Sequence, residues 1–260
     1  MDRSSRFFYA LEKMRGAKKH VTCLLAEDST PLTEPAEMCG RAQAFYATKA
    51  ISLQLGSVLA DVIHPDQTYT IPDSSIFDNL FLVRDLLELG RRDGLSFALL
   101  SLDQEKAFDR VDHRYLLNTL RAFGFGPQFV GFLLALYSSA ECLVKLNWNL
   151  TELVSFGRGV RQGCPLSGQL YALAIKPFLC LLCRRLTGLV LQEPEVQLVL
   201  PAYADVMLLV VQDPGDLEWV EACQAIYSAA SSARVNWVKS SGLALRNDLR
   251  KLSQEKQVQF

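Results

Sequence analysis

The chain reads Ala202-Tyr-Ala-Asp-Val-Met207 between two apolar runs, Val196–Leu200 and Leu208–Val211. This arrangement predicts a buried hairpin with Asp205 at its tip. A carboxylate there needs a metal ion or a cation to compensate its charge. A second apolar strand, Phe97–Leu102, runs directly into Asp103. Two carboxylates at strand ends can meet, so the sequence predicts a metal site that contains Asp103 and Asp205.

Apolar periodicity and turn signals predict the remaining elements. In chain order, we expect a strand at 21–25, helices from Glu34-Pro35, over 50–64 and from 73–74 to Gly90, a strand at 97–102, helices at 106–123 and 128–139, two strands within 141–160, a helix from the Arg161–Pro165 turn to about 185, the 196–211 hairpin and a helix at 216–233. This order indicates an α+β fold, in which an antiparallel sheet is covered by helices on one face.

Composition narrows the class of protein. The 260 residues are 50% hydrophobic and 21% charged, which is enough to build a sizeable core. Lys and Arg number 27 against 28 Asp and Glu, a balance that argues mildly against tight binding of nucleic acid. A basic arm at residues 3–19 is interpreted as solvated, with a nucleic-acid contact as the alternative.

Neither a membrane span nor a signal peptide is expected, because no apolar run reaches ~18 residues and the N-terminus has no apolar segment. The seven scattered cysteines indicate a reducing, intracellular compartment, cytoplasmic or nuclear. Cys180-Leu-Leu-Cys183 has the spacing of metal ligands. It lies in an apolar helical stretch, however, and is interpreted as part of the core.

Three motifs resemble those of reverse transcriptases from LINE-type non-LTR retrotransposons. Residues 202–207 resemble motif C, in which two adjacent aspartates hold catalytic magnesium ions, but the second aspartate is replaced by Val206. Asp103-Gln-Glu-Lys-Ala-Phe-Asp109 resembles motif A. The string Phe156-Gly-Arg-Gly-Val-Arg-Gln-Gly-Cys-Pro-Leu-Ser-Gly-Gln-Leu-Tyr171 resembles motif B and is the most specific string in the chain. The resemblance implies a palm-like antiparallel sheet and RNA-directed DNA polymerase chemistry.

The resemblance also assigns roles to single residues. Asp103, Asp205 and the backbone carbonyl of Gln104 would be Mg²⁺ ligands, and the two aspartates would be catalytic. The nucleotide-binding residues would be Phe108, which would exclude a 2′-hydroxyl, with Gln162, Gly163 and, from a region similar to motif D, Lys239. Ordinary packing for Phe108 and a solvated surface position for Lys239 remain open alternatives. Asp109 and Asp112 are interpreted as helix-surface or capping carboxylates.

A long fingers section separates segments like Arg41–Tyr46 and Lys49–Ser52 in the family, whereas here they nearly meet. We therefore expect an internal deletion, and we expect no endonuclease or thumb. The chain is divided into a basic arm and pre-polymerase segment (1–48), a palm-like domain with its fingers largely missing (49–243) and a polar tail (244–260).

Three losses together predict catalytic inactivity: the second aspartate, the fingers and the thumb. RNA template and DNA primer are the partners that the resemblance implies. Two alternatives remain open: a non-catalytic module that binds nucleic acid or protein, and a transposon-derived product without selected function.

Overall fold

The structure is a computed structural model that describes residues 24–25, 31–138, 141–147, 149–192, 195–212 and 214–245. The basic arm and the end of the polar tail lie outside these residues. The elements are β1 Leu24–Leu25, β2 Pro31–Leu32, α2 Pro35–Val62, α3 Ile76–Asp93, β3 Ala98–Asp103, the 3-10 helix η1 Ala107–Arg110, α4 His113–Ala122, α5 Pro127–Ser138, β4 Glu141–Cys142, β5 Lys145–Leu146, β6 Asn149–Leu150, β7 Val154–Ser155, α6 Ser167–Arg185, β8 Leu189–Gln192, β9 Glu195–Leu198, β10 Ala202–Tyr203, β11 Val206–Val211, α7 Pro214–Ser231 and β12 Ser241–Ala244.

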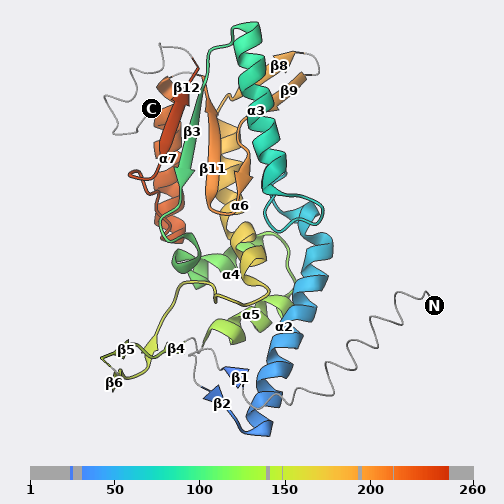
Figure 1. Ribbon diagram of the computed structural model, residues 1–260, viewed down its shortest axis with the longest axis vertical. Helices are drawn as coiled ribbons and strands as arrows, with labels where there is room; N and C mark the ends of the chain where they lie inside the picture. Colours follow the sequence, from blue (N-terminus) through green and yellow to red (C-terminus); the bar gives the residue numbers. More distant parts are fainter. Residues whose placement is uncertain are drawn as a thin grey trace, which may run out of the picture.

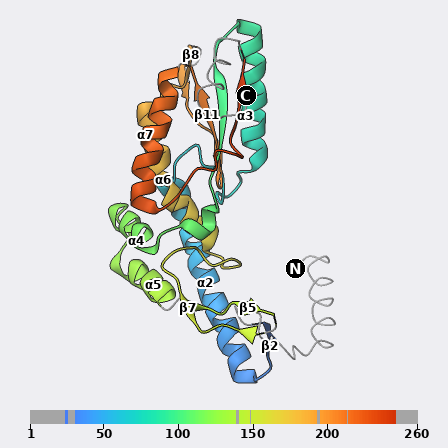
Figure 2. The same cartoon turned by 90° about the vertical axis from the view of Figure 1, so that its left-hand side faces the viewer.

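The central sheet has the strand order β10-β11-β3-β12, and every pairing is antiparallel. Because side chains alternate between the faces of a strand, Leu100 and Leu102 of β3 join the large core on one side. Leu99 points to the other side, where it packs in a cluster with Leu86 of α3. Figures 1 and 2 show α6 and α7 on the first face and α3 on the second. Helices therefore cover both faces, and the expectation of one covered face was wrong.

Helix α6 is the centre of the core. It is buried along most of its length, as expected for a helix that is apolar on nearly all sides. Pro177 lies inside it and does not end it, and Leu186, which follows the last turn, donates its N–H to the carbonyl of Leu182. The expected helix after the Arg161–Pro165 turn is thus confirmed.

The expected helix at 106–123 is interrupted. Lys106 adopts a left-handed conformation with φ 48°, and the short η1 follows it. Helix α4 begins only at His113, where the carboxylate of Asp112 accepts a hydrogen bond from the N–H of Tyr115 at 2.7 Å. Asp112 is therefore a helix cap, one of the two roles expected for it.

Two further expectations change in detail. The helices expected from Glu34-Pro35 and over 50–64 are one continuous helix, α2, with proline at its first turn. In the 196–211 hairpin, β9 pairs with the added strand β8, while β10 and β11 form the tip. Residues 199–201 still run alongside β11, because the N–H of Val210 donates to the carbonyl of Val199 at 2.8 Å.

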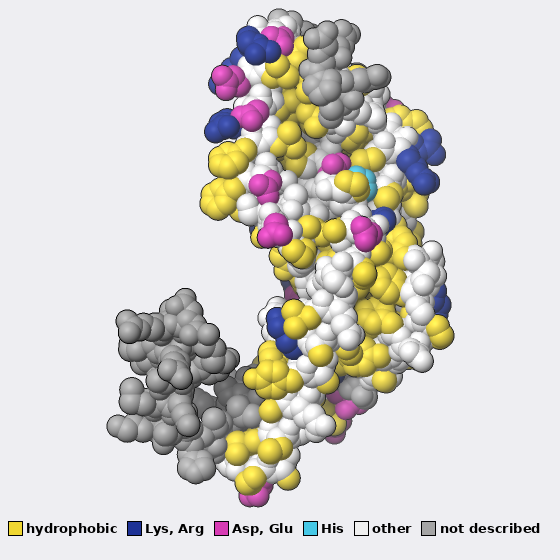
Figure 3. Space-filling model, turned by 90° about the vertical axis from the view of Figure 1, so that its right-hand side faces the viewer, with side chains coloured by type: hydrophobic (Ala, Val, Ile, Leu, Met, Phe, Trp, Pro, Cys, Tyr) yellow, Lys and Arg dark blue, Asp and Glu magenta, His cyan; other side chains and the backbone are white. Residues whose placement is uncertain are grey.

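Large apolar side chains remain exposed on α2, which contains the position of the expected deletion, and on α3. Figure 3 shows apolar side chains gathered over these helices. On α3, Phe77 is 60% exposed and Leu80 is 52% exposed. In the described residues, no helix combines the length and apolar character that crossing a membrane requires.

Candidate active site at the strand ends

Asp103 and Asp205 lie at the same end of the central sheet. Asp103 is the last residue of β3, and Asp205 belongs to the two-residue turn that joins β10 to β11. The residue directly opposite Asp103 in the register is Val206. Paired residues of an antiparallel ladder point to the same face with Cα atoms about 5 Å apart. The missing carboxylate is therefore the one that would have faced Asp103.

Tyr171 of α6 lies close enough to both carboxylates for their charges to act on it. Burial raises the pKa of Tyr171 well above its usual value, and the negative charges of Asp205 and Asp103 raise this pKa further, after a contribution from Tyr227. A fully buried phenol next to two carboxylates marks the inner wall of the site.

Gln67 holds the hairpin tip. Its side chain is buried; its Nε2 donates to the carbonyl of Ala204, and its Oε1 accepts from the N–H of Ala204, both at 3.1 Å. Ala204 has φ 53°, a left-handed conformation that is unusual for a residue other than glycine. The two hydrogen bonds from Gln67 help to keep this turn, and thus Asp205, in place. No local signal identifies Gln67, because its partner lies far away in the sequence.

Aromatic rings line the space beside the carboxylates. Phe108 stacks on Tyr171 with ring centroids 4.6 Å apart, and Tyr69 meets the ring of Phe108 edge-on at 6.3 Å. Tyr69 also meets Tyr203 of the hairpin at 5.3 Å. Phe108 is therefore a packed aromatic beside the site, which is compatible with both interpretations of this residue.

The Arg161–Pro165 turn is built by local hydrogen bonds. Cys164 donates to the carbonyl of Arg161 at 3.2 Å, and the hydroxyl of Ser167 donates to the same carbonyl. Gly163 has φ 77°, which glycine adopts without strain. Gln162 and Gly163 are exposed at the tip of this turn. Both residues are thus accessible to a ligand.

The same turn is attached to α2. The hydroxyl of Ser52 donates to the carbonyl of Pro165 at 3.0 Å, and the side-chain amide of Gln169 donates to the carbonyl of Ser52 at 3.0 Å. These bonds fix the start of α6 against the middle of the long helix.

The segment before β12 lies against Asp103. The N–H of Asn236 donates to the carbonyl of Asp103 at 2.8 Å, and the N–H of Asp103 donates to the hydroxyl of Ser240 at 3.3 Å. Lys239 is exposed in this turn, three residues from the Asn236 contact. Gln104 pairs with Val235 in an isolated bridge, so its backbone is also at this end of the sheet.

These residues do not fit a two-ion centre. Reverse transcriptases as a family use divalent metal ions, and hard cations require several oxygen ligands each. Asp103, Asp205 and the Gln104 carbonyl supply oxygen, but Val206 supplies none at the position opposite Asp103. We therefore derive no catalytic step through metal ions at this site.

Comparison with known proteins gives consistent matches. The chain is 45% identical over 367 aligned residues to the transposon TX1 uncharacterized 149 kDa protein of Xenopus laevis, covering 94% of this chain and 28% of that protein. It is 30% identical over 158 residues to the retrovirus-related Pol polyprotein from type-2 retrotransposable element R2DM of Drosophila melanogaster, covering 60% of this chain and 14% of that protein. The chain thus spans less than a third of the length of either relative.

Solved telomerase structures share the fold. The apo telomerase from Candida tropicalis superposes with a TM-score of 0.56 at 13% identity, over 83% of this chain and 42% of that chain. Telomerase from Candida albicans, in complex with a fragment of telomeric RNA, gives 0.53 at 16% identity, over 76% of this chain and 34% of that chain. The family described as reverse transcriptase (RNA-dependent DNA polymerase) matches residues 46–260. The chain therefore belongs to the reverse transcriptase family, with its relatives among LINE-type, non-LTR retrotransposons.

Proposed function

We propose that the chain is a catalytically inactive reverse transcriptase palm, spanning residues 49–243, in which the Mg²⁺ site is incomplete and the fingers are missing. The observation that carries this proposal is the register of β3 and β11, which puts Val206 opposite Asp103. A valine at this position removes a carboxylate from the metal site, and the apolar side chain cannot replace it.

Two observations support the loss of an internal segment. The alignment with the Xenopus protein extends over 367 residues although this chain has 260, so it contains gaps in this chain. In addition, Tyr46 and Leu53 of α2 are large, apolar and exposed. Exposed apolar surface of this kind is expected where a covering subdomain has been removed.

The proposed partners are an RNA template and a DNA primer. In the family motif, the turn that contains Gln162 and Gly163 packs against the templating base and the incoming nucleotide. Both residues are exposed here, and their turn is fixed to α2. The chain would then still bind a template–primer duplex without polymerase activity. Binding needs only this surface, whereas phosphoryl transfer also needs the metal ions and the fingers residues that hold the triphosphate.

Magnesium-dependent primer extension on an RNA template tests the proposal. We expect no extension by the native chain, and none by Val206→Asp, because that substitution mends the ion site and not the clamp. Extension by the native chain that Asp103→Ala abolishes would overturn the assignment of inactivity. Extension by the Val206→Asp chain alone would show that the fingers are dispensable and that Val206 is the whole defect.

A further inference from the structure

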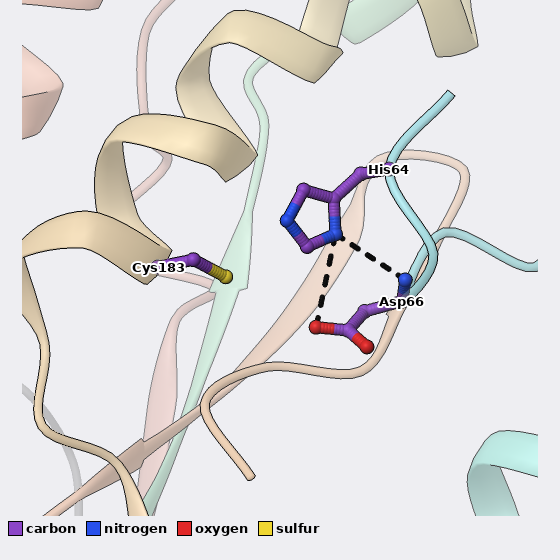
Figure 4. Close-up of side chains that lie close together, drawn as sticks. All are labelled: His64, Asp66 and Cys183. Carbon is purple, nitrogen blue, oxygen red and sulfur yellow. Dashed lines mark hydrogen bonds and ion pairs between the residues drawn. The ribbon is translucent and has the colours of Figure 1, made fainter. Parts of the chain in front are cut away.

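A second group of metal-binding side chains lies outside the strand-end site. His64 and Asp66 follow the end of α2, and Cys183 lies near the end of α6. Figure 4 shows the three side chains converging from these two segments. One donor atom from each lies within 4.8 Å of the donor atoms of the other two.

These distances are close to those of a formed site. In a tetrahedral zinc site with bonds of about 2.0–2.3 Å, neighbouring donor atoms are about 3.3–3.8 Å apart. The Nδ1 of His64 lies 3.7 Å from the Oδ2 of Asp66 and accepts a hydrogen bond from the N–H of Asp66 at 3.2 Å, which a zinc ion on this nitrogen would replace. The other distances, which are within 4.8 Å, need to shorten by up to about 1–1.5 Å to reach zinc-site spacing.

The group combines a buried side with an open one. The His64 side chain is 12% exposed, whereas that of Asp66 is 42% exposed. An ion can therefore arrive from solvent past Asp66 and meet the imidazole and the thiol at the inner end. Water is available for the fourth position of a tetrahedral ion.

The donor types select the ion. An imidazole nitrogen, a thiol sulfur and a carboxylate oxygen suit Zn²⁺, whereas Mg²⁺ and Ca²⁺ require oxygen ligands. The carboxylate of Asp66 and the thiolate of Cys183 would neutralise the two charges of a zinc ion. Lys176 opposes cation binding because it is near enough to His64 to act on its charge, but its ammonium group is hydrogen-bonded to the carbonyl of Val62.

We propose that His64, Asp66 and Cys183 bind one zinc ion, with water as the fourth ligand. The ion links the end of α2 to α6. The linked segment leads directly to Gln67, which holds the hairpin tip. The zinc ion therefore has a structural role: it fixes the segment that positions Asp205. Cys180 is not in the group of three, and the proposal departs from the core role that the sequence indicated for Cys183.

Zinc titration of the purified full chain tests this site. The chain is first stripped with a chelator, and binding is followed by calorimetry and by the shift in melting temperature. We expect one zinc ion per chain and a rise in melting temperature. His64→Ala and Cys183→Ser should each weaken binding at least tenfold. Cys39→Ser and Cys164→Ser, which alter thiols elsewhere, are the matched controls and should bind as the native chain does.

Two results would overturn the proposal. The first is zinc binding that is unchanged in the double variant His64→Ala/Cys183→Ser. The second needs no variant: native chain loaded with Co²⁺ that lacks a thiolate-to-cobalt charge-transfer band would exclude Cys183 as a ligand. Asp66→Asn, which keeps the shape of the side chain, should lower affinity with circular dichroism unchanged.

Discussion

The two faces of the central sheet are covered by helices of similar length that differ sharply in burial. Helix α6 spans 19 residues, of which 11 are buried, whereas α3 spans 18 residues, of which only Leu86 and Gly90 are buried. Both helices carry many apolar side chains. On the α6 face these side chains find partners in β3, β11 and α7. On the α3 face several of them end in solvent. The difference shows that the α6 face carries a closed core, whereas α3 covers its face with the outer side of the helix open to solvent.

The largest expected effect is a loss of stability that differs between the two faces when a leucine is replaced by alanine. Leu173→Ala in α6 removes a fully buried side chain and should lower the free energy of unfolding by about 3–4 kcal/mol. Leu80→Ala in α3 removes a side chain that is 52% exposed and should cost less than about 0.5 kcal/mol. Urea unfolding of both variants gives the comparison. Equal losses would mean that α3 is covered as fully as α6.

A smaller loss in the free energy of unfolding is expected for a substitution at the hairpin tip. Gln67→Ala leaves the backbone N–H and carbonyl of Ala204 without their side-chain partner and should cost about 2 kcal/mol. Gln54→Ala, on the exposed side of α2, is the matched control and should be nearly neutral. If both variants unfold alike, Gln67 does not hold the turn, and the position of Asp205 has another cause.

Val206→Asp should change the stability of the chain in a way that depends on divalent metal ions. It puts a third carboxylate beside Asp103 and Asp205, so like-charge repulsion should cost about 1 kcal/mol without divalent ions. Millimolar Mg²⁺ should restore part of this loss. Val238→Asp introduces the same charge at a position that is 92% exposed and should show neither effect. If Mg²⁺ does not change the melting temperature of the Val206→Asp chain, the strand-end carboxylates do not converge.

The smallest effect concerns Asp66, which lines a cavity between the sheet and α3. Burial raises the pKa of Asp66 from 3.8 to about 6. The folded state therefore holds the proton more tightly than the unfolded state. The resulting stability is fully present below about pH 4 and is lost as the pH rises through about 6.

Comparison of the native chain with Asp66→Asn isolates this contribution. The Asn variant should gain stability relative to the native chain between pH 4 and pH 7, in chelator so that no metal interferes. A flat difference for Asp66→Asn would mean that solvent reaches the carboxylate freely from the α3 side.

Local patterns predicted the parts of the molecule that local physics determines. The apolar strand before Asp103, the long α6 and the hairpin around Asp205 follow from periodicity, and their meeting at one sheet end follows from the antiparallel arrangement. The interruption at Lys106 was missed because the amphipathic pattern continues through it. The exposure of Leu80 could not be predicted from periodicity, which identifies an apolar face but does not reveal whether a partner covers it.

The missed contacts are those made across long sequence separations. Gln67 acts on a turn 137 residues away, and Cys183 of α6 lies near His64, which follows the end of α2. Neither pairing leaves a local signature, so only the assembled fold identifies them.

The central position of β3 has a consequence during protein synthesis. Its neighbours β11 and β12 both come later in the chain, and Leu100 pairs with Leu209. At about 5–20 residues per second, a ribosome needs roughly 5–20 s to make the intervening hundred residues. Throughout that interval β3 has no strand to pair with, and its leucines are open to chaperones or to neighbouring chains. Assembly of the sheet therefore waits for the synthesis of β11 and β12, and the yield of folded chain should depend on how fast translation proceeds from β3 to β12.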